Sequence, residues 1–246
     1  MSIRPVPEHN HLLAALPASA RERFFSRLKL VELELGEVIY DAGQPLEYVY
    51  FPTDCIISLL YVMLDGTCDQ ISVVGYEGMA GVAVFMGGEN TPSRAVVQSR
   101  GCAYRMSSLD LQREFNAYGD IRALMLRFTQ ALITHMSQTA VCNRHHSIDQ
   151  QLCRWLLMFM DRLSGNCLKI THELIANMLG VRRESVTEAA GKLQKLRAIE
   201  YHRGQITVID RPKLETLCCE CYAVIKHETD RLSSYSTTPL RPAYKT

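Results

Sequence analysis

The sequence has no long hydrophobic run, and its first ten residues lack the apolar core of a secretory signal. A membrane span needs about 18 consecutive apolar residues, and no stretch approaches that length. We therefore expect a cytoplasmic protein with no membrane partner. A glycine-rich phosphate loop, a nucleophile elbow and a metal-hydrolase signature are also missing, so we do not expect an enzyme.

An excess of charge of one sign is absent as well. The 27 Lys and Arg residues nearly balance the 26 Asp and Glu residues, for a net charge of +1. Any nucleic-acid interface must therefore be a local patch. The 246 residues, 47% of them hydrophobic, are enough for two modest domains. Nine scattered cysteines in a cytoplasmic protein are expected to be thiols.

The first half of the chain has the sequence pattern of a β-rich domain. A short amphipathic helix is predicted over residues 11–28. From about residue 29 to 105, short apolar or alternating runs are separated by turn residues, which is typical of a sandwich or barrel. Asp65-Gly66 predicts a hairpin with a type I′ turn, because both residues accept positive φ.

Beyond Ser107 the turn residues become sparse and helices are expected. A long helix is predicted to begin at Asp120, whose carboxylate suits a helix N-terminus. Five residues follow at the spacing of a coiled-coil seam: Ile121, Met125, Phe128, Leu132 and His135. The seam either packs on the helix's own domain or forms a dimerising coiled coil, and both interpretations stay open at this point.

Residues 171–193 have the pattern of a helix-turn-helix. Thr171 can cap a first helix, and Gly180 can end it in the left-handed conformation. Ala176 is small, as the close crossing of two helices requires. The second helix presents polar side chains from its first turns: Arg182, Arg183, Glu184 and Thr187. In this motif such positions contact base edges in the major groove.

A β-hairpin is predicted after the second helix, because residues 199–209 alternate around Arg203-Gly204. The hairpin would form a wing beside the helix. Five basic residues here are candidates for phosphate contacts: Lys192, Lys195, Arg197, His202 and Arg203. The alternative is an ordinary helical hairpin with solvated charges, but the complete set of anchors followed by a wing favours DNA binding.

The segment Arg183-Glu184-Ser185-Val186 resembles the Arg-Glu-Thr-Val core of the recognition helix in CRP/FNR bacterial transcription regulators. The resemblance covers roughly residues 12–209. It implies an α+β fold with three parts: a cyclic-nucleotide-binding-like β jelly-roll sensor domain (12–118), a dimerisation helix (119–146) and a winged helix-turn-helix domain (147–232). Residues 233–246 are polar and contain proline, which predicts a disordered tail.

The resemblance also implies a homodimer that reads a palindromic site on double-stranded DNA and contacts RNA polymerase. Arg183 and Glu184 would read bases, and Thr171, Arg182 and Ser185 would make backbone or flanking contacts. One position departs from the family: Glu188 stands where cyclic-AMP-responsive members have a further basic residue. Its carboxylate would repel phosphate or accept a hydrogen bond from cytosine.

The expected effector pocket departs from the family more strongly. The position of the ribose-binding carboxylate, after Gly81, is Val82, and that of the phosphate-binding arginine is Ser93, with Arg94 one place later. A shift of one residue in a strand moves a side chain to the opposite face. A Thr-Ser pair that touches the base in cyclic-AMP-responsive members reads Met136-Ser137. These losses indicate an unidentified small-molecule effector other than cyclic AMP, and no cofactor is predicted.

Cysteine clusters offer a different sensing chemistry. Residues 1–54 contain no cysteine, which disfavours the N-terminal iron–sulfur centre of FNR-type oxygen sensors. Two groups contain metal-ligand residue types: Cys142, His145, His146 and Cys153, and then Cys218, Cys219 and Cys221. Neither spacing matches a standard zinc pattern, so packing roles are expected and no metal is predicted. The alternative function is a ligand-binding or redox- or metal-sensing module that regulates a protein partner.

Overall fold

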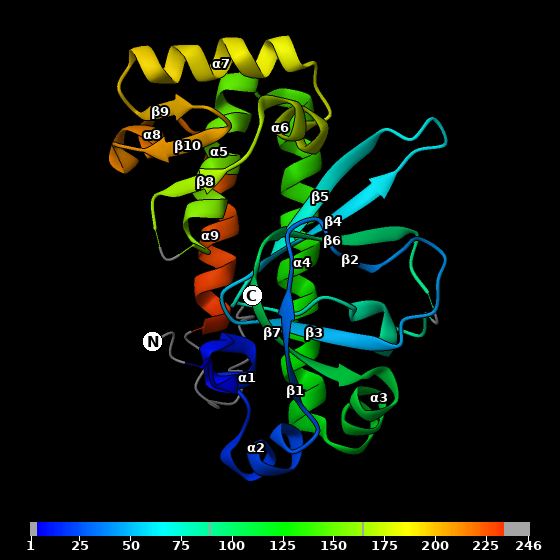
Figure 1. Ribbon diagram of the computed structural model, residues 1–246. Helices are drawn as coiled ribbons and strands as arrows, with labels where there is room; N and C mark the ends of the chain where they lie inside the picture. Colours follow the sequence, from blue (N-terminus) through cyan, green and yellow to red (C-terminus); the bar gives the residue numbers. More distant parts are fainter. Residues whose placement is uncertain (1–3, 89, 164, 234–246) are drawn as a thin grey trace, which may run out of the picture.

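The computed structural model describes residues 4–88, 90–163 and 165–233 (Figure 1). The tail predicted to be disordered lies, apart from Ser233, outside these residues. A β-rich N-terminal half and a smaller, mostly helical C-terminal half are joined by one long helix. Within the described ranges, no helix is both long and apolar enough to cross a membrane.

Two antiparallel sheets form the N-terminal half. Their strands are β1 (Lys29–Leu33), β2 (Val38–Tyr40), β3 (Tyr48–Pro52), β4 (Ile56–Val62), β5 (Cys68–Val74), β6 (Ser93–Ser99) and β7 (Gly101–Ser107). One sheet has the order β1-β7-β3 and the other β2-β6-β4-β5. Inward side chains from both sheets, including Phe51 and Val97, share one buried core. The sandwich predicted from strand spacing is therefore confirmed.

The hairpin predicted at Asp65-Gly66 is present between β4 and β5, but its turn type was wrong. Gly66 alone has a positive φ, of 84°, whereas a type I′ turn needs two such residues. The Gly66 N–H donates to the Met63 carbonyl, and the Met63 N–H donates to the Thr67 carbonyl. The loop thus has three residues and closes with glycine in the left-handed conformation. The Asp65 carboxylate accepts from Thr67, which stabilises it.

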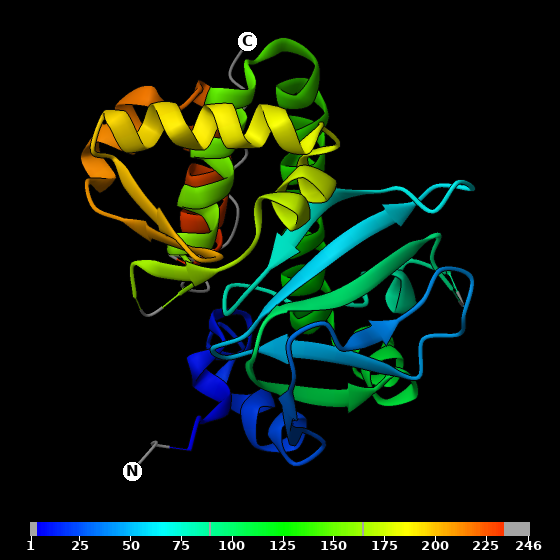
Figure 2. The same ribbon diagram turned by 45° about the horizontal axis from the view of Figure 1, so that its top comes forward.

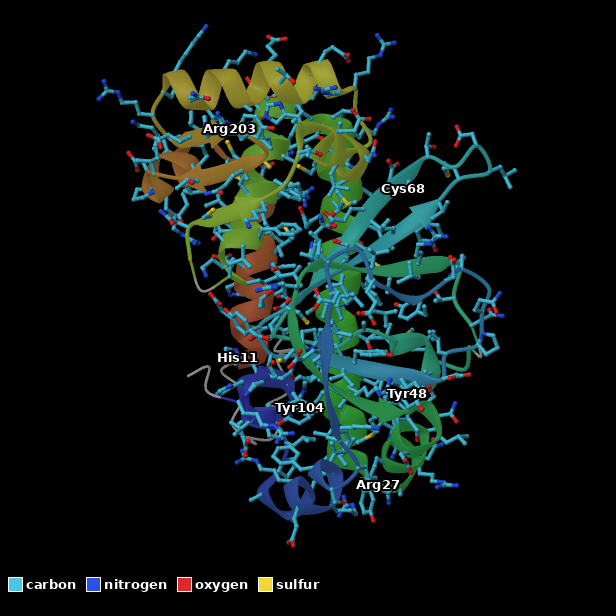
Figure 3. All side chains as sticks on the ribbon, in the orientation of Figure 1. His11, Arg27, Tyr48, Cys68, Tyr104 and Arg203 are labelled. Atoms are coloured by element: carbon cyan, nitrogen blue, oxygen red, sulfur yellow. The ribbon has the colours of Figure 1, made fainter. Side chains whose placement is uncertain are left out.

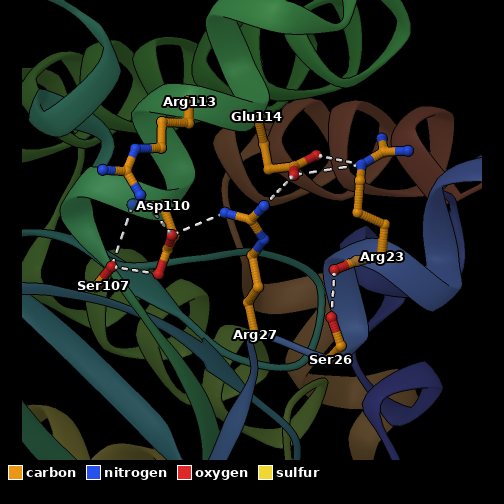
Figure 4. A network of polar contacts seen from close by, with 7 residues as sticks. All are labelled: Arg23, Ser26, Arg27, Ser107, Asp110, Arg113 and Glu114. Atoms are coloured by element: carbon orange, nitrogen blue, oxygen red, sulfur yellow. Dashed lines mark hydrogen bonds and ion pairs between the residues drawn. The ribbon is translucent and has the colours of Figure 1, made fainter.

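The N-terminal half also contains short helices: η1 (Pro7–His9), α1 (His11–Ala14), α2 (Ala18–Phe25), η2 (Val82–Phe85) and α3 (Ser108–Ala117). The single helix predicted over residues 11–28 is instead two helices, because Pro17 interrupts it and disfavours helical backbone before it. Ion pairs join α2 and the residues just after it to α3 (Figure 4). Arg23 binds the buried carboxylate of Glu114, and Arg27 binds Asp110.

The long helix α4 (Gly119–His145) settles how the predicted seam packs. All five of its residues are buried by the rest of the same chain, so the interpretation as own-domain packing is confirmed for them. A different stripe of α4 is exposed: Leu126, Ile133 and Val141. The sequence analysis did not identify this stripe, because the buried seam has the stronger periodicity.

The C-terminal half contains α5 (Ile148–Met160), β8 (Cys167–Lys169), α6 (His172–Leu179), α7 (Arg183–Lys195), β9 (Ile199–His202), β10 (Gln205–Val208), α8 (Arg211–Leu217) and α9 (Glu220–Ser233). Its strands form a small sheet with the order β8-β10-β9. Helix α7 lies across one end of this half, with the β9–β10 hairpin beside it (Figure 2). The core centres on α5, where Leu156 and Phe159 are fully buried.

Polar groups hold the two halves together. Glu77, after β5, forms an ion pair with Arg162, after α5, at 2.7 Å, and both side chains are less than a tenth exposed. The Trp155 Nε1–H donates to Oε1 of Gln70 at 2.7 Å. These contacts fix the position of α5, and with it that of the helices that pack on α5.

Candidate DNA-binding interface

Helices α6 and α7 form the predicted helix-turn-helix. The Thr171 hydroxyl oxygen accepts from the Leu174 N–H at 3.2 Å and caps α6. Gly180 ends α6 with a φ of +64°, and its N–H donates to the Ala176 carbonyl. Both predictions are confirmed. A residue with a Cβ would be strained at that φ, so glycine is what allows the chain to turn sharply into α7.

Helix α7 has one buried face and one exposed face. Val186, Ala189, Ala190 and Leu193 are buried against the rest of the C-terminal half. Arg182, Arg183, Glu184 and Thr187 are exposed, and Ser185 is half-buried. The Arg183 side chain is 66% exposed, with a Glu173 carboxylate oxygen 3.9 Å from its Nε. The predicted base-reading side chains thus project from the first turns of α7 into solvent.

A histidine that the sequence analysis did not single out supports this surface. The Thr187 hydroxyl donates to the Arg183 carbonyl, so His172 Nδ1–H donates to the Thr187 oxygen at 3.0 Å. The His172 ring stacks on Tyr201 of β9, with centroids 4.0 Å apart. Burial and the charge of Arg183 lower the pKa of His172. A neutral imidazole therefore links α6, α7 and the hairpin. The only indication in the sequence was its position next to the capping Thr171.

The predicted wing is present as the β9–β10 hairpin. Its two turn residues, Arg203 and Gly204, have φ values of +46° and +77°, the pattern of a type I′ turn. Figure 3 shows Arg203 at this turn, below α7. A surface groove runs between α7 and the hairpin and is lined by Thr171, His172, Glu173, Arg183, Thr187, Gln194, Tyr201 and Arg203.

Comparison with known proteins agrees with this geometry. Residues 150–217 match the Crp-like helix-turn-helix domain family. The whole fold is similar to FixK2 from Bradyrhizobium japonicum, with a TM-score of 0.66 at 16% identity, over 78% of this chain and 98% of that one. Residues 150–217 are therefore a Crp-like helix-turn-helix domain, and the fold of the chain is the one found in CRP/FNR regulators.

Two further proteins show a likeness to this chain. A CRP-family transcriptional regulator from Thermus thermophilus has a TM-score of 0.64 at 15% identity, over 76% of this chain and 95% of that one. The global nitrogen regulator of Synechococcus elongatus is 22% identical over 193 residues, which is 74% of this chain and 86% of the relative. These identities are low, so the likeness of the solved structures concerns the fold.

Two carboxylates lie beside Lys192, one basic residue of the predicted interface. Lys192 Nζ lies 3.1 Å from Glu188 and 3.2 Å from Asp149. The departure from the family at Glu188 therefore has a local partner one helical turn away. Both acidic side chains are exposed, so phosphate would have to compete with them for Lys192.

The residues predicted to line an effector pocket differ in their surroundings, and two of them bond to neighbouring side chains. Arg94, on β6, forms two hydrogen bonds of 2.8 Å with the Asp41 carboxylate, and this pairing lowers the pKa of Asp41. Ser93 is buried and shares a hydrogen bond of 2.9 Å with Thr91. Ser137 is exposed on α4. Gly81, with a φ of +108°, precedes η2, which begins at Val82. Arg94 thus has a carboxylate partner within the sandwich.

Proposed function

We propose that this chain is a CRP/FNR-type transcriptional regulator, a cytoplasmic homodimer that reads a palindromic DNA site through α7. Residues 12–118, 119–146 and 147–232 would be its sensor, dimerisation and DNA-binding parts. The observation that carries the proposal is the exposure of Arg183 and Glu184 on the first turn of a helix whose other face is buried. RNA polymerase would be the partner through which the bound dimer changes transcription.

The side chains fit recognition of a G·C base pair and its flanks. The Arg183 guanidinium can donate to O6 and N7 of guanine, and the Glu184 carboxylate can accept from N4 of cytosine. Thr171, Arg182, Ser185 and Thr187 would contact the adjoining backbone. Lys192 and Arg203 would contact phosphates from α7 and the wing.

The exposed stripe of α4 supports a dimer. Leu126, Ile133 and Val141 are each 47–48% exposed, and their spacings of seven and eight residues keep them on one side of the helix. In a two-fold dimer the same stripe of each copy would pack against the other. Half-sites about one helical turn of DNA apart would match that symmetry.

The dimer is tested by placing charge in the stripe. Leu126→Asp combined with Ile133→Asp should convert the protein to a 27.9 kDa monomer in light scattering, since paired carboxylates would face each other in the interface. Leu109→Asp, at a 65% exposed leucine of α3, is the control and should leave the dimer intact. A dimer that survives the double substitution would place the interface elsewhere.

DNA reading is tested with fragments from upstream of the regulator's own gene. Wild-type affinity should fall steeply with salt and differ between fragments. Arg183→Ala should weaken the best fragment by about 1–3 kcal/mol, roughly 5- to 150-fold, and relax preference at one base pair. Arg113→Ala, an exposed arginine of α3, is the control and should bind normally. Equal binding of all fragments by wild type, or no loss in Arg183→Ala, would refute the proposal.

The proposal includes a small-molecule effector. A small molecule other than cyclic AMP is expected, because Val82 cannot accept from a ribose hydroxyl and Arg94 already has Asp41 as partner. A ligand that prefers the folded state raises the melting temperature. A thermal-shift screen should therefore find a stabilising compound, and cyclic AMP should leave the melting temperature unchanged.

A further inference from the structure

Two cysteine groups that are far apart in the sequence meet in the structure. Cys142 and His146 come from the last turn of α4 and its C-cap, and Cys219 and Cys221 from the start of α9. Their four ligand atoms all lie within 4.8 Å of one another. We propose that these side chains bind a single divalent thiophilic cation, with Zn²⁺ as the expected ion. We call them the Cys3His cluster.

The distances fit tetrahedral coordination. Bonds of about 2.3 Å to sulfur and about 2.0–2.1 Å to nitrogen give edges of about 3.7 Å between two sulfurs and about 3.6 Å between sulfur and nitrogen. Cys142 Sγ lies 3.6 Å from Cys219 Sγ, and Cys221 Sγ lies 3.6 Å from His146 Nδ1. A small movement of side chains would place all four around one ion. Cys3His is a ligand set of structural zinc sites.

The histidine is oriented as a metal ligand. Its Nε2 lies 3.3 Å from Oε1 of Glu220, while Nδ1 faces the sulfur atoms. A hydrogen bond from Nε2–H to a carboxylate keeps the proton off Nδ1 and makes that nitrogen the better ligand. The same arrangement of carboxylate, histidine and metal recurs in zinc proteins. Glu220 thus positions His146 rather than binding the ion.

The charges near the cluster suit bound thiolates. The guanidinium of Arg154 is a cationic group whose charge acts on the Cys142 sulfur. Arg154 is 3% exposed, its Nε has no hydrogen-bond partner, and it pairs with no carboxylate of the described chain. Three thiolates and one divalent cation carry a net charge of −1, which Arg154 would balance.

The surroundings of the Cys3His cluster and its position in the fold show what a bound ion would do. Cys218, Cys219 and Glu220 line a surface groove, so an ion can reach the cluster from solvent. The four ligands join the C-terminal end of α4 to the junction of α8 and α9, and α4 and α9 pack along each other (Figure 1). A bound ion would therefore tie the long helix to the half that carries α7. Because ligand ions stabilise the folded state they bind, removing the ion should loosen that connection.

The test uses full-length protein purified under reducing conditions without chelators. Elemental analysis should find about one zinc per chain. Cys219→Ser, Cys221→Ser and His146→Ala should each lower the zinc content at least several-fold. Cys218→Ser and His145→Ala are matched controls, since each changes the same residue type at a neighbouring position outside the cluster. Both controls should keep their zinc.

Cobalt(II) substitution of wild type tests the ligand set even if a variant fails to fold. It should give intense tetrahedral d–d bands and thiolate-to-cobalt charge-transfer bands. The proposal is overturned if wild type contains no more zinc than Cys219→Ser and shows no cobalt–thiolate bands. It is also overturned by a Cys142–Cys219 disulfide in metal-free protein isolated without oxygen. None of these measurements depends on DNA binding, so failure here leaves the proposed function standing, and the reverse is also true.

Discussion

The surface of α7 and the contact between the two halves use polar side chains in opposite ways. On α7, Arg183 and Glu184 are exposed, and the Glu173 carboxylate near Arg183 is exposed too. Between the halves, Glu77 and Arg162 are buried and bind each other, so each needs its partner. Polar residues on α7 can therefore change with modest effect on folding, whereas those in the contact cannot change singly.

The largest expected effect breaks the buried ion pair. Glu77→Gln should lower the free energy of unfolding by about 3–5 kcal/mol, because the Arg162 guanidinium would remain buried without a carboxylate. The Gly75 N–H, which donates to Oε1 of Glu77, would also lose a charged acceptor. Urea denaturation measures the change.

The matched control for Glu77→Gln is Asp41→Asn. Asp41 and Arg94 also form a close ion pair, but their side chains are 43% and 36% exposed. Exposed pairs contribute about 0–1 kcal/mol, so the control should be nearly neutral. Equal losses of unfolding free energy in the two variants would show that burial does not determine how much each ion pair contributes to stability.

The comparison between α7 and the contact between the halves also explains how much of the structure could be predicted from the sequence. The helix-turn-helix could be recognised because Thr171, Gly180 and Arg183 lie in one continuous segment where capping, a left-handed turn and an exposed first turn each require particular residue types. Alternating strands predicted the sandwich for the same local reason. Two local predictions were wrong: the type of the turn at Gly66, and the single helix over residues 11–28, which Pro17 divides.

Contacts between distant segments could not be predicted in this way. Cys142 and Cys219 each belonged to a group with no standard spacing, and only the packing of α4 on α9 brings them together. The role of His172 could not be predicted either, because it depends on the position of Tyr201, which lies on a later strand. The exposed stripe of α4 that includes Ile133 became visible only after the buried seam had been assigned to the chain's own core.

The next prediction compares two glycines: Gly180, at the contact between the two halves, and Gly191, on α7. Gly180→Ala should lower the free energy of unfolding by about 1–2 kcal/mol, since a Cβ is strained at a φ of +64°. The added Cβ would also lie 2.5 Å from Oδ1 of Asp69 on β5, so this exposed carboxylate would have to move away. Gly191→Ala, in the interior of α7 with nothing within 4 Å, should raise it by up to about 1 kcal/mol. Thermal or urea denaturation should give opposite signs, and a loss in both variants would contradict this account.

The smallest effect concerns His135, which is buried in the contact, with its Nδ1 3.0 Å from the Ser72 hydroxyl. Burial, and then the charges of Arg162 and Arg154, hold the pKa of His135 well below its usual value of about 6.5. The unfolded chain therefore takes up a proton below about pH 6.5 that the folded chain does not. The stability that neutral His135 provides is complete above that pH and is lost as the pH falls below it.

This predicts that wild-type stability falls by about 1.4 kcal/mol between pH 7.5 and 5.5 through His135 alone. His172, whose pKa is also lowered, contributes in the same direction, so wild type must be compared with His135→Gln, which leaves His172 unchanged and can still bond Ser72. Urea denaturation at the two pH values should show a smaller pH-dependent loss in His135→Gln. His145→Gln, at an exposed histidine, should lose stability like wild type. An unchanged pH-dependent loss of stability in His135→Gln would mean that His135 becomes protonated in the folded chain as readily as in the unfolded one. The contact between the halves would then not keep His135 neutral.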